Sequence, residues 1–190
     1  ATFEQPIILR LFGDVPVVEI NELSSTGKFN LPVGITNPFK VITAKPDSDS
    51  ADYYWICENN GHGAIVSGFG VSTVDIFDNN GSIRAATGAT DSSQFRSHWS
   101  ASSGSGTKTG RDLTPGFPTG TIVASTETEW VLFGEEGAGG TPLRGFATGF
   151  TIFGREVSDE FIAAVVQKHI DLRPSPSDEL VNDSGDKLVR

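Results

Sequence analysis

The sequence has few of the residues from which catalytic and metal sites are usually built. Among its 190 residues there is one cysteine, Cys57, and there are three histidines. A lone cysteine excludes an intramolecular disulfide and a zinc site made of several cysteines. Because Cys57 follows Y-Y-W-I, we interpret it as a small apolar residue of a buried strand; the alternative is a reactive or intermolecular thiol. A disulfide-free fold is typical of a chain made in a reducing cytosol.

Basic residues are also scarce. The 14 lysines and arginines are outnumbered by 24 aspartates and glutamates, which gives a formal net charge of -10. No stretch of the sequence concentrates lysine and arginine, and a surface this acidic repels the phosphates of nucleic acids. We therefore expect no nucleic-acid partner, and the charge itself favours solubility.

Long apolar runs are missing as well. A membrane-spanning helix needs about 20 consecutive apolar residues, and the runs in this sequence are only a few residues long. The first residues, A-T-F-E-Q-P, lack the basic and apolar regions of a signal peptide. These features predict a chain that is made in the cytoplasm without a signal peptide and that has no membrane partner.

Motifs for hydrolysis and for cofactor binding are absent too. There is no G-x-S-x-G, H-E-x-x-H or C-x-x-C motif, and in residues 104–109 (G-S-G-T-K-T) Thr107 separates the glycine from the lysine, unlike a phosphate-binding loop. The glutamate pairs in Glu127–Glu129 and Glu135–Glu136 fit a glycosidase only if two acids face each other across a cleft. We predict no catalytic residue, no cofactor and no metal site, and keep a hydrolase as the less favoured alternative.

The three histidines do not form a motif. His62 lies in the turn-like segment N-N-G-H-G, and we interpret it as an exposed turn residue. His98 precedes a tryptophan in a polar segment, where it is either an exposed loop residue or part of a binding site. His169 falls near the end of a predicted helix, where a packing or capping role is favoured.

What the sequence does contain is a series of β-branched and aromatic runs separated by Gly, Pro and Asn. Runs of this kind predict strands. Their ranges are 6–12, 15–20, 28–31, 39–44, 53–57, 63–69, 71–77, 120–125, 129–133 and 143–153. Between 74–77 and 82–85, the turn D-N-N-G predicts a β-hairpin, because Asn-Gly accepts positive φ; a calcium site is the alternative, but its carboxylate spacing is missing. The pattern predicts a mainly β fold, an antiparallel sandwich or barrel-like domain.

One helix is predicted, over about 158–172. Ser158 is a suitable N-cap, and Asp159 and Glu160 place negative charge at the positive end of the helix dipole. Apolar residues then recur at helical spacing until Pro174 prevents continuation. Residues 1–172 are therefore expected to form a single β-rich domain, followed by an extended polar tail at 173–190.

A long segment at 87–119 interrupts the strand pattern. It is rich in Ser, Thr and Gly, and its first part has almost no aliphatic residues, although it contains Phe95 and Trp99. Structureless loops of this length are uncommon in compact domains and are often functional. We therefore predict a long inserted loop whose aromatic rings are buried on a neighbouring molecule, together with the polar tail.

This reasoning predicts a structural, self-assembling or decoration subunit of a larger particle, such as a virion capsid or tail component, that acts through protein–protein contacts and homo-oligomer formation. The candidate interface residues are Phe95, His98, Trp99, Leu180, Val181 and Leu188.

The alternative prediction is a carbohydrate- or ligand-binding β-domain, because tryptophan and tyrosine rings offer flat platforms to a ligand. Trp99 is the surface candidate for that role, whereas Trp55 and Trp130 fall in predicted core strands. Carbohydrate is thus a second partner class, beside protein.

Overall fold

The computed structural model describes residues 2–3, 8–20, 27–47, 53–58, 64–67, 74–79, 83–118, 126–132, 145–175, 177 and 180–181. These residues form two antiparallel sheets and one helix, α1 (Asp159–Asp171). The prediction of a mainly β, sandwich-like fold with a single helix near the C-terminus is confirmed. Within the described ranges, no helix is long and apolar enough to cross a membrane.

The first sheet, called sheet A, contains strands from both halves of the chain. In spatial order its strands are β1 (Thr2–Phe3), β4 (Gly27–Thr36), β14 (Thr126–Leu132), β6 (Tyr53–Glu58), β7 (Ala64–Ser67), β8 (Val74–Asn79), β9 (Ile83–Ala89) and β13 (Phe117–Pro118). The predicted hairpin is present, because β8 pairs antiparallel with β9. The predicted strand at 120–125 lies outside the described residues.

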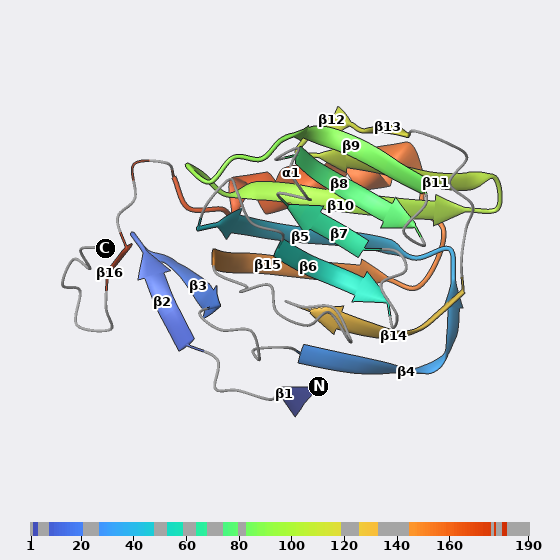
Figure 1. Ribbon diagram of the computed structural model, residues 1–190, viewed down its shortest axis with the longest axis horizontal. Helices are drawn as coiled ribbons and strands as arrows, with labels where there is room; N and C mark the ends of the chain where they lie inside the picture. The colour runs from blue at the N-terminus through green and yellow to red at the C-terminus, as the bar shows by residue number, and fades with distance from the viewer. Residues whose placement is uncertain are drawn as a thin grey trace.

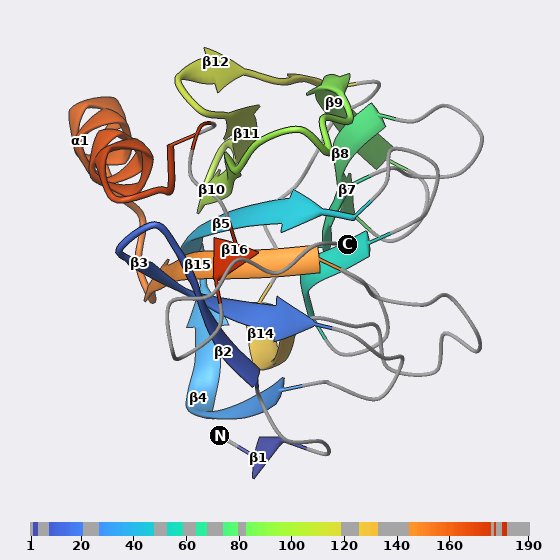
Figure 2. The ribbon, with the colours of Figure 1, turned by 90° about the vertical axis from the view of Figure 1, so that its left-hand side faces the viewer.

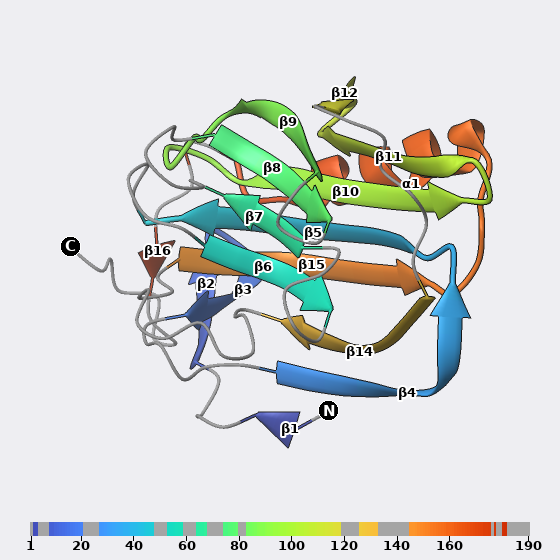
Figure 3. The ribbon, with the colours of Figure 1, turned by 45° about the vertical axis from the view of Figure 1, so that its right-hand side comes forward.

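The second sheet, called sheet B, carries the helix. In spatial order its strands are β12 (Thr114–Pro115), β11 (Gly106–Arg111), β10 (Arg96–Ser103), β5 (Phe39–Pro46), β15 (Gly145–Phe153), β3 (Val15–Ile20), β2 (Ile8–Phe12) and β16 (Leu180–Val181). Figures 1 and 3 show sheet A in front of the central strands of sheet B. Figure 2, turned by 90°, shows α1 on the outer side of sheet B, so the layers run helix, sheet B, sheet A.

The helix forms where the sequence predicts it. Ser158 is the N-cap, and its side chain accepts a hydrogen bond from the Phe161 N–H. Ile162 and Val166, one turn apart, are buried against Phe39, Val41, Trp99 and Ala101 of sheet B. Burial of this apolar stripe is what holds a helix of this length, which would be marginal in isolation.

The prediction of a structureless loop across 87–119 is wrong for its central part. Strands β10 and β11 occupy most of it and form a hairpin in which Ser103 pairs with Gly106. Strand β10 is a central strand, since it also pairs with β5 along Arg96–Ala101. Serine and threonine suit a strand when neighbours on both sides complete its backbone hydrogen bonds. The two-residue connection Gly104–Ser105 was the sequence signal for this hairpin.

The aromatic residues of the segment are therefore part of the chain's own core. Phe95 is 3% exposed and its ring packs edge-on against Phe12, while His98 and Trp99 are 3% and 8% exposed. Alternation along β10 sends Trp99 toward the helix and His98 toward sheet A. All three candidate interface residues are thus packed within their own chain, and only a small part of the Trp99 ring stays exposed, which corrects the prediction made from their sequence context.

The C-terminal candidates give a similar picture. Leu180 and Val181 form β16, which pairs with Phe12 and Leu11 of β2 in the same chain. Leu188 lies outside the described residues. The part of the predicted tail that the structure describes thus begins against the domain, where Arg173 donates to the Phe95 carbonyl.

Candidate functional site: a cleft between helix α1 and the β10–β12 edge

A cleft of about 350 Å³ lies between α1 and the edge of sheet B formed by β10, β11 and β12. We call it the Trp99 cleft. Its apolar lining comes from Trp99, Leu113, Pro115, Ile162, Ala163 and Val166. Its polar lining comes from Thr107, Lys108, Thr109, Asp112 and Asp159. Small-molecule sites in proteins have this composition, a mostly apolar wall with a few placed polar groups, and volumes of about 300–1,000 Å³.

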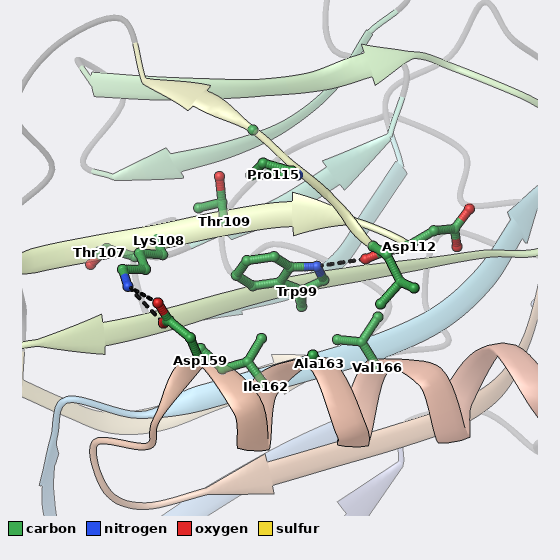
Figure 4. Close-up of a pocket in the computed structure, with 12 residues that line it drawn as sticks. Trp99, Thr107, Lys108, Thr109, Asp112, Pro115, Asp159, Ile162, Ala163 and Val166 are labelled. Carbon is green, nitrogen blue, oxygen red and sulfur yellow. Dashed lines mark hydrogen bonds and ion pairs between the residues drawn. The ribbon is translucent and has the colours of Figure 1, made fainter.

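Trp99 occupies the centre of the cleft. Figure 4 shows its indole ring between strand β11 and helix α1, with the ring nitrogen directed at the backbone of Asp112. That nitrogen donates a hydrogen bond of 2.9 Å to the Asp112 carbonyl oxygen. The ring lies over Gly110, where a Cβ atom would come within 2.4 Å of the indole. The glycine is therefore what lets the ring lie flat against β11.

Asp112 fixes the turn that follows β11. Its carboxylate accepts hydrogen bonds from the Ser97 N–H, from Arg96 and from Arg173, at 3.0, 2.9 and 2.8 Å. Burial opposes ionisation of this carboxyl, but these donors outweigh it and hold the pKa of Asp112 below its ordinary value. Asp112 is thus ionised at neutral pH and anchors one end of the cleft.

Arg96 extends this network behind the cleft. It donates to Asp91 through Nε and an Nη atom, at 3.1 and 2.6 Å. Burial works against ionisation of Asp91, yet hydrogen bonds from Ser93 and Arg96 lower its pKa to about 2. Two carboxylates and two guanidinium groups, those of Arg96 and Arg173, therefore balance each other in charge.

The other end of the cleft is closed by an ion pair. The Lys108 Nζ lies 2.6 and 2.8 Å from the two carboxylate oxygens of Asp159, the first residue of α1 (Figure 4). Both side chains are well exposed, at 63% and 70%. The pair ties the β10–β11 hairpin to the helix start and places a donor and an acceptor at the rim.

Thr109 is the polar residue of the lining whose hydroxyl lacks a partner. The residue is 4% exposed, and its buried Oγ1 makes no hydrogen bond. A buried hydroxyl without a partner costs about 1–3 kcal/mol. Thr109 pairs with Ser100, so its side chain lies on the face of the hairpin opposite to Trp99, and its inaccessible hydroxyl does not open into the cleft (Figure 4).

A second groove, of about 510 Å³, lies on the opposite side of α1 and is lined by β15 and the helix. We call it the His169 groove. Nδ1 and Nε2 of His169 lie 3.0 Å from the Thr43 hydroxyl and 2.8 Å from the Thr151 hydroxyl. The Thr43 hydroxyl also meets that of Ser97, at 2.8 Å. The imidazole and these hydroxyls thus use one another as partners, the Lys168 ammonium lies at the exposed edge of the groove, and burial lowers the pKa of His169.

The residues of the Trp99 cleft were only partly foreseen from the sequence. Trp99 was the predicted surface candidate for a ligand; the structure places it in the wall of the cleft, largely buried. Lys108, Thr109 and Asp112 were not predicted as site residues, because nothing local relates them to a helix that begins at residue 159. Among the described residues, no group of three or more His, Cys, Asp or Glu side chains is arranged to hold a metal ion.

No family model matches this chain, and no curated protein matches it in sequence. Solved structures do resemble it in fold. Domain 4 of AbnA, an extracellular arabinanase from Geobacillus stearothermophilus solved with arabinotriose, matches at a TM-score of 0.62 and 10% identity, covering 86% of this chain and 82% of that one. The sialidase of Trypanosoma rangeli in complex with sialic acid matches at 0.62 and 9% identity, covering 87% of this chain.

A third similar structure is the module CBM40 of the Ruminococcus gnavus IT-sialidase, bound to α2,3 sialyllactose. It matches at a TM-score of 0.50 and 12% identity, covering 79% of this chain and 96% of the module. This chain spans 33% of the sialidase from Trypanosoma rangeli. At these identities the likeness shows a shared β-sandwich fold.

The prediction of an assembly subunit is contradicted. That prediction assumed that the rings of Phe95 and Trp99 have no packing partners in their own chain. Both rings are buried within the chain. The similar structures named above come from an arabinanase and two sialidases.

Proposed function

We propose that this chain is a carbohydrate-binding β-sandwich domain and that the sugar binds in the Trp99 cleft. The observation that carries the proposal is the combination of the fold with this cleft. Two independent matches, domain 4 of the arabinanase and CBM40, were solved with oligosaccharides, and each is covered almost whole by this chain.

The chemistry of the cleft supports a sugar as the ligand. A sugar ring has apolar C–H faces and a rim of hydroxyl groups that both donate and accept hydrogen bonds. The indole of Trp99 and the side chains of Leu113 and Pro115 offer apolar surface to such faces. At the rim, the Lys108 ammonium can donate to a sugar hydroxyl and the Asp159 carboxylate can accept from one.

The same residues support binding without hydrolysis. A glycosidase needs a carboxylic acid with a raised pKa that can protonate the leaving oxygen, and a second carboxylate opposite it. The pKa of Asp112 is shifted in the opposite direction by its hydrogen-bond donors. The carboxylate of Asp159 is held by Lys108 at the exposed rim.

Two neighbouring alanines of α1 provide the test. Ala163 and Ala164 are both exposed, and Ala163 lines the Trp99 cleft whereas Ala164 lines the His169 groove. A glycan array would first identify an oligosaccharide ligand, and calorimetric titration would then compare Ala163→Trp with Ala164→Trp. An indole at 163 fills the Trp99 cleft, so we expect affinity to fall at least about tenfold, equivalent to about 1.4 kcal/mol. Ala164→Trp should bind as the unmodified protein does.

Gln167→Trp serves as a control, because Gln167 is exposed on the same helix and lines neither groove. Circular dichroism should show the same fold in all three variants. The opposite ranking, with loss only in Ala164→Trp, would move the site to the His169 groove. An array without any bound glycan would refute carbohydrate binding altogether.

A further inference from the structure

We propose that the Trp99 cleft selects neutral oligosaccharides and rejects sugars that carry a carboxylate. This inference rests on the proposed function and adds the chemical class of the ligand to it. The observation behind it is that the cationic groups in and behind the cleft already have carboxylate partners.

The first step concerns the lining of the cleft. Lys108 is the one cationic residue of that lining in the part of the chain that the structure describes, and the acidic residues of the lining are Asp112 and Asp159. Its ammonium group contacts both oxygens of Asp159. Asp112 is in turn paired with Arg96 and Arg173, so a ligand carboxylate would find no unpaired cation in the lining.

The second step concerns the arginines behind the lining. Proteins usually bind a carboxylate with an arginine that offers two parallel N–H groups. Arg96 is held between Asp91 and Asp112, at 2.6 and 2.9 Å, and Arg173 is held by Asp112, at 2.8 Å. Turning either guanidinium toward a ligand would remove an ion-pair partner from a partly buried carboxylate, which is costly.

The third step concerns what a neutral sugar gains. One sugar hydroxyl at the rim can accept from the Lys108 ammonium while a neighbouring hydroxyl donates to Asp159, so the ion pair remains intact. No net charge has to be desolvated in any of these contacts.

The test uses matched ligands and one variant that reverses the preference. The unmodified domain is titrated calorimetrically with the pairs lactose and sialyllactose, and galactotriose and trigalacturonate, and with arabinotriose as a further neutral sugar. We expect a neutral sugar to bind and its carboxylated counterpart to bind at least about tenfold more weakly, or not measurably. In Asp159→Asn, which releases Lys108, the carboxylated member should gain about fivefold or more.

Asp171→Asn is the control for charge alone. It removes one negative charge from the other end of the same helix, outside the cleft, and should leave the preference unchanged. Both aspartates are exposed, so both variants should keep the fold.

If the unmodified domain prefers the carboxylated sugar of a matched pair, the proposed selectivity for neutral sugars is refuted, whereas carbohydrate binding itself is supported. An unchanged preference in Asp159→Asn also overturns the selectivity, because it removes the role of the ion pair. If no sugar of either class binds here and the glycan array is also negative, the proposed function fails, and this inference fails with it.

Discussion

The two grooves beside α1 are built from similar materials but differ in what they leave for a ligand. Each is floored by strands of sheet B and walled by the helix. In the His169 groove, the polar atoms of Thr43, Thr151 and His169 bond to one another. In the Trp99 cleft, the Lys108–Asp159 ion pair lies exposed at the rim, where it can still donate and accept further hydrogen bonds. A groove offers a ligand only the hydrogen bonds that its own residues have not used.

The largest expected effect comes from the glycines beneath each groove. A Cβ atom at Gly110 would lie 2.4 Å from the Trp99 ring and 2.6 Å from the Thr114 carbonyl oxygen, whereas one at Gly149 would lie 3.0 Å from the His169 ring. The backbone oxygen has little room to move, but the imidazole can shift. We therefore expect Gly110→Ala to lower the free energy of unfolding by about 3 kcal/mol and Gly149→Ala by about 1 kcal/mol.

Urea denaturation measures both values. Calorimetric titration with the sugar sharpens the comparison. The Gly149→Ala variant should bind the sugar as the unmodified protein does, because the His169 groove is not the proposed sugar site. Equal destabilisation by the two substitutions would show that the wall of the Trp99 cleft is no more rigid than that of the His169 groove.

A smaller effect is expected from the unpaired hydroxyls of the β10–β11 hairpin. Thr109 and Ser100 are opposite each other on β11 and β10, and both have a buried hydroxyl without a partner. Thr109→Val and Ser100→Ala each remove that hydroxyl, so each should raise the free energy of unfolding by up to about 1 kcal/mol. Thr109 lines the cleft and Ser100 does not. Both hydroxyls are inaccessible and lie on the face of the hairpin opposite to Trp99, so sugar affinity should stay unchanged in both variants.

The readouts are chemical denaturation for stability and calorimetry for affinity. Ser100→Ala is the matched control, because it removes the same kind of group from the paired strand. Loss of sugar affinity in Thr109→Val alone would contradict this placement of the two hydroxyls.

The smallest expected effect is on the pH dependence of the melting temperature, which differs between the titrating groups beside the two grooves. Burial lowers the pKa of His169, so the folded protein binds protons less readily there than the unfolded chain does. The stabilisation is present above the ordinary histidine pKa of 6.5 and is lost as the pH falls below it. We expect the melting temperature to fall by a few degrees at most between pH 7.5 and about pH 5.

The carboxylates beside the Trp99 cleft respond in a lower range. The pKa values of Asp91 and Asp112 are lowered, that of Asp91 to about 2, so their stabilisation is lost only as the pH falls below their ordinary value of 3.8. His169→Gln should abolish the loss near pH 6 and leave the acid transition in place. Identical melting curves for the two proteins from pH 7.5 to 5 would show that His169 is not the titrating group.

Much of the fold could be predicted from the sequence, because its signals are local. Ser158 before Asp159 and Glu160 fixes the helix start, and the apolar stripe fixes which face packs. Runs such as 15–20 and 53–57 contain β-branched and aromatic residues between turn signals, and they are strands β3 and β6. The hairpin at 96–111 was missed, because serine and threonine resemble loop residues until neighbouring strands are known.

The candidate site could not be predicted in the same way. Lys108 meets Asp159 across 51 residues of sequence, and Arg173 reaches the Phe95 carbonyl across 78. Local patterns carry no information about contacts at such separations, so neither the cleft nor its charge balance is visible in the sequence.

The sequence alone determined the mainly β class, the acidic charge and the limits of the helix, since composition and the spacing of neighbouring residues are enough to set them. Only the tertiary structure decided that Phe95 and Trp99 are buried within their own chain and that a cleft forms beside the helix. The physical reason is that burial of an apolar ring is favourable against any apolar surface, and the sequence does not say which surface that is. Here sheet B and α1 provide it within the same chain.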